Sequence, residues 1–348
     1  MMFRIVLLLI FLIQFALSSP TSQSIGYAGN YLTTSVGIGE PPQFFDLALS
    51  FSSDKFFVLD RSTNDPDLDY AYDYIKSLYL PEASETVNMT NDFCKERYMI
   101  SSSIYTAQGV YAHDLITLGG QQYENLVRFC DLNAKRTTST SSNDPLNWLM
   151  KLPVDGFFGL KPGGENAYEK AITRDTSEIS LFINNKSTES DNAGTITFGG
   201  QDKDNCKNFL TFPSEDSDSL STWISKVSFN SKNYQGYYST SFNTRNDTLV
   251  VPYDVYLGIS EYFNSQMTYF YCNNYQNPPD LVLTIYGHDY KLSIKNQIII
   301  YSGSYCQVNI GYASSSDEYQ LVISRAILDN YCLYFDYEEA LIGLSEKK

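Results

Sequence analysis

Short apolar segments alternate with turn residues along most of the chain, a pattern typical of β-strands. Several of these segments stop at glycine or proline clusters, which favour tight turns. Helical patterns are few, and they cover residues 165–173, 253–263 and 325–330. The sequence therefore predicts an all-β fold with a few short helices. The clearest strand-like segments are residues 31–38, 44–49, 56–59, 109–118 and 195–198.

The N-terminal segment has the composition of a secretory signal peptide. Arg4 precedes a short apolar run that ends in small residues near Ser18. A membrane anchor is the alternative, but a bilayer span needs about 20 apolar residues and this run is shorter. We therefore expect residues 1–18 to be removed and the mature chain to have no membrane attachment.

Charge and composition exclude several classes of function. The 348 residues include 24 Lys and Arg against 40 Asp and Glu, a net charge of −16, which disfavours nucleic acid as a partner. Only two histidines are present, His113 and His288, too few and too far apart for a histidine-based zinc site. We accordingly expect no metal and no cofactor. The 29 tyrosines agree with a strand-rich fold.

Cysteines and sequons agree with an extracellular chain. Six cysteines and no CxxC motif indicate three disulfides rather than a zinc or redox site, and sequence alone leaves their pairing open. Asn88, Asn185 and Asn246 each begin an N-glycosylation sequon, which predicts a surface loop. We expect a secreted glycoprotein, with a lysosomal or other endomembrane lumen as the alternative location.

Six stretches, in the order of the family, resemble pepsin-like aspartic peptidases. The most specific is Asp155-Gly-Phe-Phe-Gly-Leu160, which is similar to the DGxxGL signature of that family. The likeness extends over about residues 31 to 345, nearly the whole mature chain. The other five stretches are residues 31–45, 109–120, 195–202, 223–229 and 331–344.

This resemblance implies two β lobes with a cleft between them, the acid-protease fold. We place the N-terminal lobe at residues 19–202 and the C-terminal lobe at 203–348, and we expect a monomer. The resemblance also suggests how the cysteines pair. The implied disulfides are Cys94–Cys130, Cys206–Cys332 and Cys272–Cys306.

The two catalytic positions of the family are substituted in this sequence. Aspartic peptidases need two adjacent carboxylates, one ionised and one protonated, each on a tight Asp-Thr/Ser-Gly turn. Ungapped alignment places Ser50 and Asn243 at the two aspartates, and neither side chain can act as a general base. Ser52 and Arg245 replace the two glycines of these turns, whereas Thr244 is retained.

Other features agree with lost activity. The flap tyrosine of the family aligns with Ser102, although a shifted loop would bring Tyr105 there. Asp46, Asp54 and Asp247 flank the two turns, but making any of them catalytic requires a gap that the surrounding sequence does not need. We also expect no basic pro-segment before residue 31.

Three further polar motifs each have a structural explanation and a functional one. The carboxylates between Asp65 and Asp73 indicate a solvated acidic loop rather than a calcium site. His113-Asp114 lies mid-strand, where a structural role is favoured over half a catalytic triad. The tyrosines at 70–79 and 234–238 fit a binding surface or strand packing equally well.

Three functional hypotheses follow. The first is a non-catalytic pseudo-peptidase that binds a peptide or protein in the cleft. The second is an active acid endopeptidase with an unrecognised carboxylate pair. The third is a structural extracellular glycoprotein whose cleft is vestigial.

Overall fold

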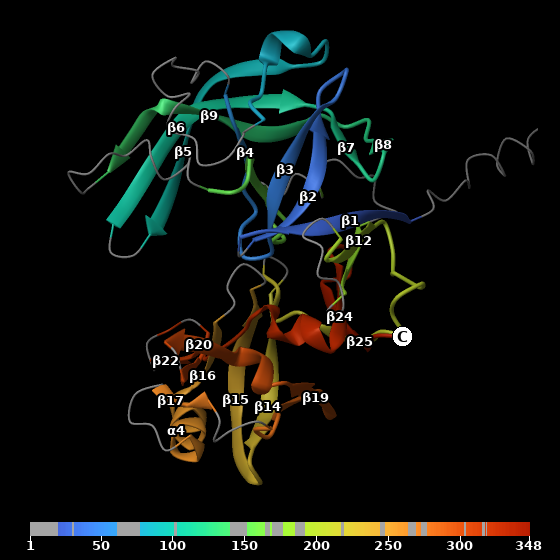
Figure 1. Cartoon of the computed structure of the whole chain (residues 1–348). Coiled ribbons are helices and arrows are strands. Elements are labelled where there is room, and N and C mark those ends of the chain that lie inside the picture. The colour runs from blue at the N-terminus through green and yellow to red at the C-terminus, as the bar shows by residue number, and fades with distance from the viewer. Residues whose placement is uncertain are drawn as a thin grey trace, which may run out of the picture.

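Two β lobes are joined by a shared antiparallel sheet in the computed structural model of the chain (Figure 1). The mostly-β, two-lobed prediction is confirmed. The longest helix among the described residues is α4 (Tyr253–Tyr262), which falls in a predicted helical segment. The structure describes residues 20–29, 31–60, 77–100, 103–139, 152–163, 168, 177–184, 192–216, 219–243, 248–263, 269–272, 277–302, 304–314, 317 and 319–348.

The first lobe is built on strands that the sequence pattern predicts well. The expected strands at 31–38 and 56–59 form with those bounds, and 44–49 forms with one more residue at each end. The predicted strand 109–118 is the later part of a longer strand and a short continuation before Gly119-Gly120. Its strands are β2 (Tyr31–Ile38), β3 (Gln43–Ser50), β4 (Phe56–Leu59), β5 (Asn88–Ile100), β6 (Ser103–Asp114), β7 (Ile116–Leu118), β8 (Gln121–Gln122), β9 (Val127–Ser139) and β10 (Gly156–Gly159).

A six-stranded antiparallel layer connects the lobes, in the order β13-β25-β24-β11-β12-β1. Its strands come from both ends of the chain and from the middle, so residues far apart in sequence lie side by side here (Figure 1). The predicted lobe boundary at residue 202 falls between β12 and β13. The strands are β1 (Thr21–Ala28), β11 (Glu178–Ile183), β12 (Gly194–Phe198), β13 (Leu210–Pro213), β24 (Tyr331–Asp336) and β25 (Leu341–Glu346).

The second lobe holds a seven-stranded sheet and a small three-stranded sheet. Helix α4 packs against β14, β15, β16 and β22, and buries Val255 and Ile259. The larger sheet contains β14 (Ser221–Phe229), β15 (Lys232–Phe242), β16 (Leu249–Pro252), β18 (Leu281–Ile285), β19 (His288–Leu292), β22 (Ile310–Ala313) and β23 (Leu321–Ile323). The smaller contains β17 (Tyr269–Tyr271), β20 (Ile298–Ser302) and β21 (Tyr305–Val308).

The central strands of the two lobes repeat one topology. The first lobe runs β2-β3-β10-β4-β9 and the second runs β14-β15-β23-β16-β22. In both, the four successive pairings are antiparallel, parallel, antiparallel and parallel. The repeat means that a residue in one lobe has a defined counterpart in the other.

Buried apolar side chains fill both lobes and the layer between them. The Phe51 ring at the end of β3 lies 5.2 Å from that of Phe335 in β24, so the first lobe packs directly on the connecting sheet. Tyr337 also donates a hydrogen bond to the carbonyl of Leu160, at 2.5 Å. Burying one such ring contributes about 1.5–3 kcal/mol, so these contacts hold the lobe in place.

Candidate functional site

The first candidate position, Ser50, is the last residue of β3. This strand runs parallel to β10, with Ser50 opposite Gly159, and the amide of Leu160 donates to the Ser50 carbonyl at 2.8 Å. Ser50 is only 1% exposed, and its hydroxyl lies 3.4 Å from that of Ser52. The turn therefore starts from a buried hydroxyl, while Ser52 itself is exposed.

The turn after Ser50 rests directly on β10. A Cβ added at Gly159 would lie 2.5 Å from the backbone nitrogen of Lys55 and 2.6 Å from the carbonyl carbon of Asp54. Real Cβ atoms do not approach backbone this closely, so residue 159 must be glycine for the turn to adopt this position. The second glycine of the DGxxGL stretch is thereby explained by packing.

Asp155, which begins the same stretch, is a structural carboxylate. It is buried, and its Oδ2 accepts from the Asp46 amide at 2.9 Å while Oδ1 accepts from the Ser77 amide at 3.0 Å. These bonds fix the residue before β10 against the middle of β3 and against the segment that contains Ser77. The carboxylate of Asp155 therefore has a structural role, since its hydrogen bonds hold β10 beside β3, the strand that carries Ser50.

The second candidate position, Asn243, follows β15 directly. This strand runs parallel to β23, with Phe242 opposite Ile323, and the Asn243 amide donates to the Ile323 carbonyl at 2.9 Å. Asn243 is half-buried. The next residue after β23 is Ser324, whose hydroxyl accepts from the Ala326 amide and caps the short helix η6 (Arg325–Asp329).

Ser50 and Asn243 lie at the same end of two strands, β3 and β15, that occupy matching places in the repeated topology. Leu49 lies opposite Phe158 in the parallel pair of the first lobe, as Phe242 lies opposite Ile323 in the second. The residues that follow Leu49 and Phe242 are Ser50 and Asn243. The two repeats thus end on a hydroxyl and an amide, which donate and accept hydrogen bonds but do not titrate near neutral pH.

Several expected site residues lie outside the described residues, namely Ser102, Arg245, Asn185, Asn246 and Asp247. Among the others, Tyr105 belongs to β6 and pairs with Tyr98 of β5 in the long hairpin. Asp46 is exposed on β3, and Asp54 lies beside Gly163 in the turn. Asn88 is exposed at the start of β5. The acidic segment between 65 and 73 also lies outside the described residues.

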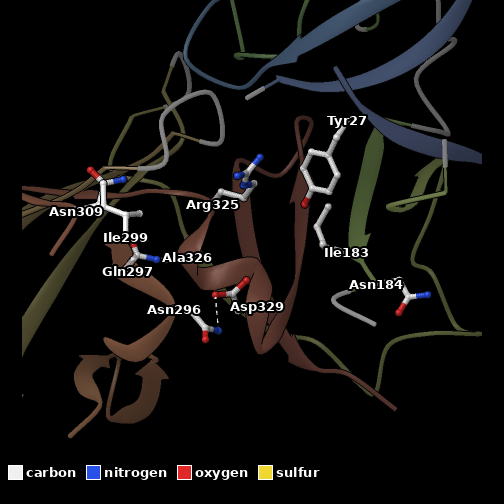
Figure 2. Close-up of a pocket in the computed structure, with 10 residues that line it drawn as sticks. All are labelled: Tyr27, Ile183, Asn184, Asn296, Gln297, Ile299, Asn309, Arg325, Ala326 and Asp329. Atoms are coloured by element: carbon white, nitrogen blue, oxygen red, sulfur yellow. Dashed lines mark hydrogen bonds between the residues drawn. The ribbon is translucent and has the colours of Figure 1, made fainter. Parts of the chain in front are cut away.

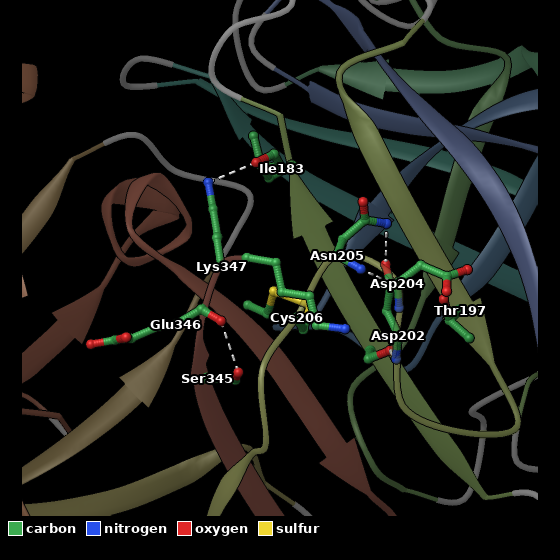
Figure 3. The surroundings of a disulfide bond; sticks show 12 residues. Ile183, Thr197, Asp202, Asp204, Asn205, Cys206, Ser345, Glu346 and Lys347 are labelled. Atoms are coloured by element: carbon green, nitrogen blue, oxygen red, sulfur yellow. Dashed lines mark hydrogen bonds between the residues drawn. A yellow bond between two sulfur atoms is a disulfide. The ribbon is translucent and has the colours of Figure 1, made fainter.

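All three implied disulfides are present. Cys94–Cys130 joins β5 to β9, and Cys272–Cys306 lies in the small sheet of the second lobe. Cys206–Cys332 joins the segment after β12 to β24 (Figure 3). Beside it, the buried Asp202 carboxylate accepts from the Asn205 side chain at 2.8 Å and from two backbone amides, which fixes the turn before Cys206.

His113 and Asp114 form no part of a catalytic triad. The buried Asp114 carboxylate accepts from Tyr79 at 2.8 Å, from Thr86 and from the Leu115 amide, and not from His113. These contacts hold the first-lobe hairpin and the segment before it. The tyrosines of residues 234–238 differ in their exposure to solvent. Tyr237 is 81% exposed, whereas Tyr238 is buried.

One buried acid escaped the sequence analysis. Asp131 of β9 is buried, and its Oδ1 has no hydrogen-bond partner among the described residues. Burial raises the pKa of Asp131 to about 8, and the nearby Asp60 carboxylate adds to the rise. Asp131 lies opposite Val58 in β4, away from the strand ends that carry Ser50 and Asn243. Only its apolar neighbours Cys130 and Leu132 hinted at burial.

Comparison with protein families matches residues 30–347 to the eukaryotic aspartyl protease family. The chain belongs to that family. A search of curated proteins finds no significant match. In this aspartyl protease family member, the described residues contain no group of three or more His, Cys, Asp or Glu that could hold a metal. No helix in the described ranges is long and apolar enough to cross a membrane.

Proposed function

We propose that this family member is a non-catalytic pseudo-peptidase that binds a peptide or protein segment in its interlobe cleft. The observation that supports the proposal is that β3 ends at Ser50 and β15 is followed by Asn243, so neither of these two matching strands ends on a carboxylate. Peptide hydrolysis by this family requires both acids, since one holds and deprotonates water while the other protonates the peptide.

The scaffold around these positions is retained although the acids are absent. Gly159 still admits the close turn, and Asp155 still ties β10 to β3. The exposed Ser52 hydroxyl and the half-buried Asn243 amide offer donors and acceptors that suit a peptide backbone. Retained architecture with neutral hydrogen-bonding groups supports binding rather than hydrolysis.

We also propose a secreted or lumenal location. Three disulfides persist only in oxidising compartments for most organisms, and the net charge of −16 does not favour attachment to anionic membranes. The signal peptide at residues 1–18 and glycans at the sequons belong to this proposal.

A peptidase assay tests the loss of catalysis. Purified protein is incubated with a mixed peptide library between about pH 3 and 6, the range of acid peptidases, with and without a pepstatin-type inhibitor. We expect no inhibitable cleavage. A matched variant carries Ser50→Asp, Asn243→Asp, Ser52→Gly and Arg245→Gly, and any cleavage gained by it locates the active positions. Inhibitable cleavage by the unmodified protein would overturn the proposal.

A binding measurement separates a peptide-binding protein from a purely structural one. Library peptides retained by the immobilised protein are identified and their dissociation constants measured. Hydrogen exchange then reports where they bind, and we expect protection at the ends of β3 and β15. Failure to retain any peptide, or protection elsewhere, would favour the structural glycoprotein instead.

A further inference from the structure

A polar cavity of about 510 Å³ lies between the connecting sheet and the second lobe (Figure 2). Tyr27 of β1 and Asn184, directly after β11, line it from the connecting sheet. Residues of η5 (Lys295–Gln297), β20 and η6 line it from the second lobe. Its volume is within the range of about 300–1,000 Å³ of small-molecule sites. Neither Ser50 nor Asn243 lines it, so it is separate from the proposed peptide cleft.

Among the described residues that line this cavity, Arg325 and Asp329 carry one charge of each sign. The Arg325 guanidinium lies 4.8 Å from the centroid of the Tyr27 ring, and this cation–π contact orients it. Behind the wall, the Lys347 ammonium donates to the carbonyls of Ile183 at 2.6 Å and Asp329 at 2.9 Å. Among the described lining residues, Asp329 carries the one carboxylate. The arrangement favours a ligand that carries a carboxylate.

A buried amide provides a second, independent indication of a ligand. Gln297 lines the cavity and is only 7% exposed, yet its side chain makes no hydrogen bond within the described part of the chain. The amide atoms of Gln297 open onto the cavity rather than being fully enclosed by protein, so an occupant can form hydrogen bonds with them. Asn309 also lines the cavity, with its Oδ1 fixed by a 2.9 Å bond from Thr248.

We propose that this cavity binds a di- or tripeptide with a free α-carboxylate. Arg325 pairs with the carboxylate, because a guanidinium matches its two oxygens. Asp329, which accepts a bond from Asn296 at 2.9 Å, attracts the α-ammonium group. The amides of Gln297 and Asn309 each offer a donor and an acceptor, the set that a peptide group requires.

A neutral sugar fits the cavity less well. Sugar sites use an aromatic face as a platform, and the guanidinium of Arg325 already lies over the Tyr27 ring. Because the cavity is lined from both the connecting sheet and the second lobe, a bound peptide bridges them and stabilises the folded chain.

Isothermal titration calorimetry of the full mature chain tests the proposal with three probes: glycyl-L-glutamine, its C-terminal amide and glucose. We expect the free dipeptide to bind most tightly and the amide at least tenfold more weakly. Arg325→Gln should raise the dissociation constant of the free dipeptide about 10- to 100-fold, as expected for a lost charged hydrogen bond. Gln297→Leu should raise it about tenfold.

Arg128→Gln is the matched control, since Arg128 also lies over a tyrosine ring, that of Tyr111 at 3.5 Å, but in the first lobe. It should leave the affinity unchanged. Circular dichroism and thermal unfolding verify that each variant folds, and Arg325→Lys provides a conservative second variant that retains the charge. The proposal fails if no dipeptide binds at millimolar concentration, if the amide binds equally well, if Arg325→Gln has no effect, or if glucose binds more tightly.

Discussion

At the residue scale, the buried acids of this protein serve structure. Asp155 accepts two backbone amides, Asp114 accepts two hydroxyls and an amide, and Asp202 holds the turn before a disulfide. Such bonds satisfy the carboxylate oxygens and offset the cost of burying them. Asp131 differs because one of its oxygens has no partner among the described residues and Asp60 lies nearby.

Asp131 makes the stability of the fold depend on pH. Its pKa is about 8 in the folded chain against 3.8 for the ordinary group, so the folded state holds a proton that the unfolded state has lost. The contribution of Asp131 to the free energy of unfolding should therefore be fully present below about pH 4 and be lost as pH rises to about 8. Asp131→Asn should remove this loss. The free energy of unfolding of the variant, relative to that of the unmodified chain, should therefore be roughly 2–4 kcal/mol higher at pH 8 than at pH 5.

Chemical denaturation of both proteins at several pH values measures this difference. Asp46→Asn is the control, because Asp46 is exposed on β3 of the same lobe. If Asp131→Asn and the unmodified chain show parallel stability curves from pH 4 to 9, the assignment is wrong.

At the element scale, β10 supports the turn after Ser50 because residue 159 has no side chain. Gly159→Ala places a methyl group where the backbone of Asp54 and Lys55 already lies. The turn must move, which should cost about 1–3 kcal/mol of stability. Gly311→Ala on β22 is the control, since its added Cβ would meet only ordinary contacts at 3.6 Å and beyond. Thermal unfolding that ranks the two variants equally would contradict this account of the turn.

The disulfides should differ in their effect on stability. Cys206–Cys332 closes a sequence separation of 126 residues and Cys94–Cys130 one of 36, while all four cysteines are equally buried. Chain entropy assigns about 5 kcal/mol to the longer loop and about 4 kcal/mol to the shorter. Replacing each pair by alanines should therefore lower the free energy of unfolding more for Cys206–Cys332, by about 1 kcal/mol. The opposite order in chemical denaturation would mean that strain or residual structure dominates over loop closure.

At the scale of the whole molecule, two similar β units and a layer between them form one body. The central strands of the two units share one topology, with Ser50 at the end of β3 and Asn243 directly after β15. Contacts such as that of Phe51 with Phe335 fix the first lobe on the layer. The net charge of −16 favours solubility over association with nucleic acid.

Secretion is a property of the whole chain and has a direct measurement. Expressed in eukaryotic cells, the protein should appear in the medium without residues 1–18, and glycosidase treatment should lower its apparent mass. Asn88 is exposed, so Asn88→Gln should remove one glycan. Asn208→Gln serves as a control because Asn208 is also exposed and begins no sequon. A full-length chain retained inside the cell would contradict this expectation.

Local pattern was sufficient for much of the fold. Short apolar segments that end at glycine and proline residues predicted strands such as 31–38 and 56–59 with the correct bounds. This was possible because strand and turn preferences act over a few residues. The six cysteines indicated three disulfides, and family resemblance supplied their pairing. The same resemblance indicated Ser50 and Asn243 as the residues that align with the two catalytic aspartates.

Tertiary structure decided what depends on residues distant in the chain. Parallel pairing of β3 with β10, and of β15 with β23, joins segments about 80 to 110 residues apart, and no local pattern encodes such a register. In the sequence, Asp131 resembles any acidic residue in a strand. Its burial becomes apparent only in the folded sheet, where β9 lies between β4 and β6. The cavity beside Arg325 exists only because β1 and η6, from opposite ends of the chain, meet there. Sequence fixes local conformation through short-range sterics and periodicity, whereas burial, electrostatic environment and cavity shape arise from contacts that only the folded chain makes.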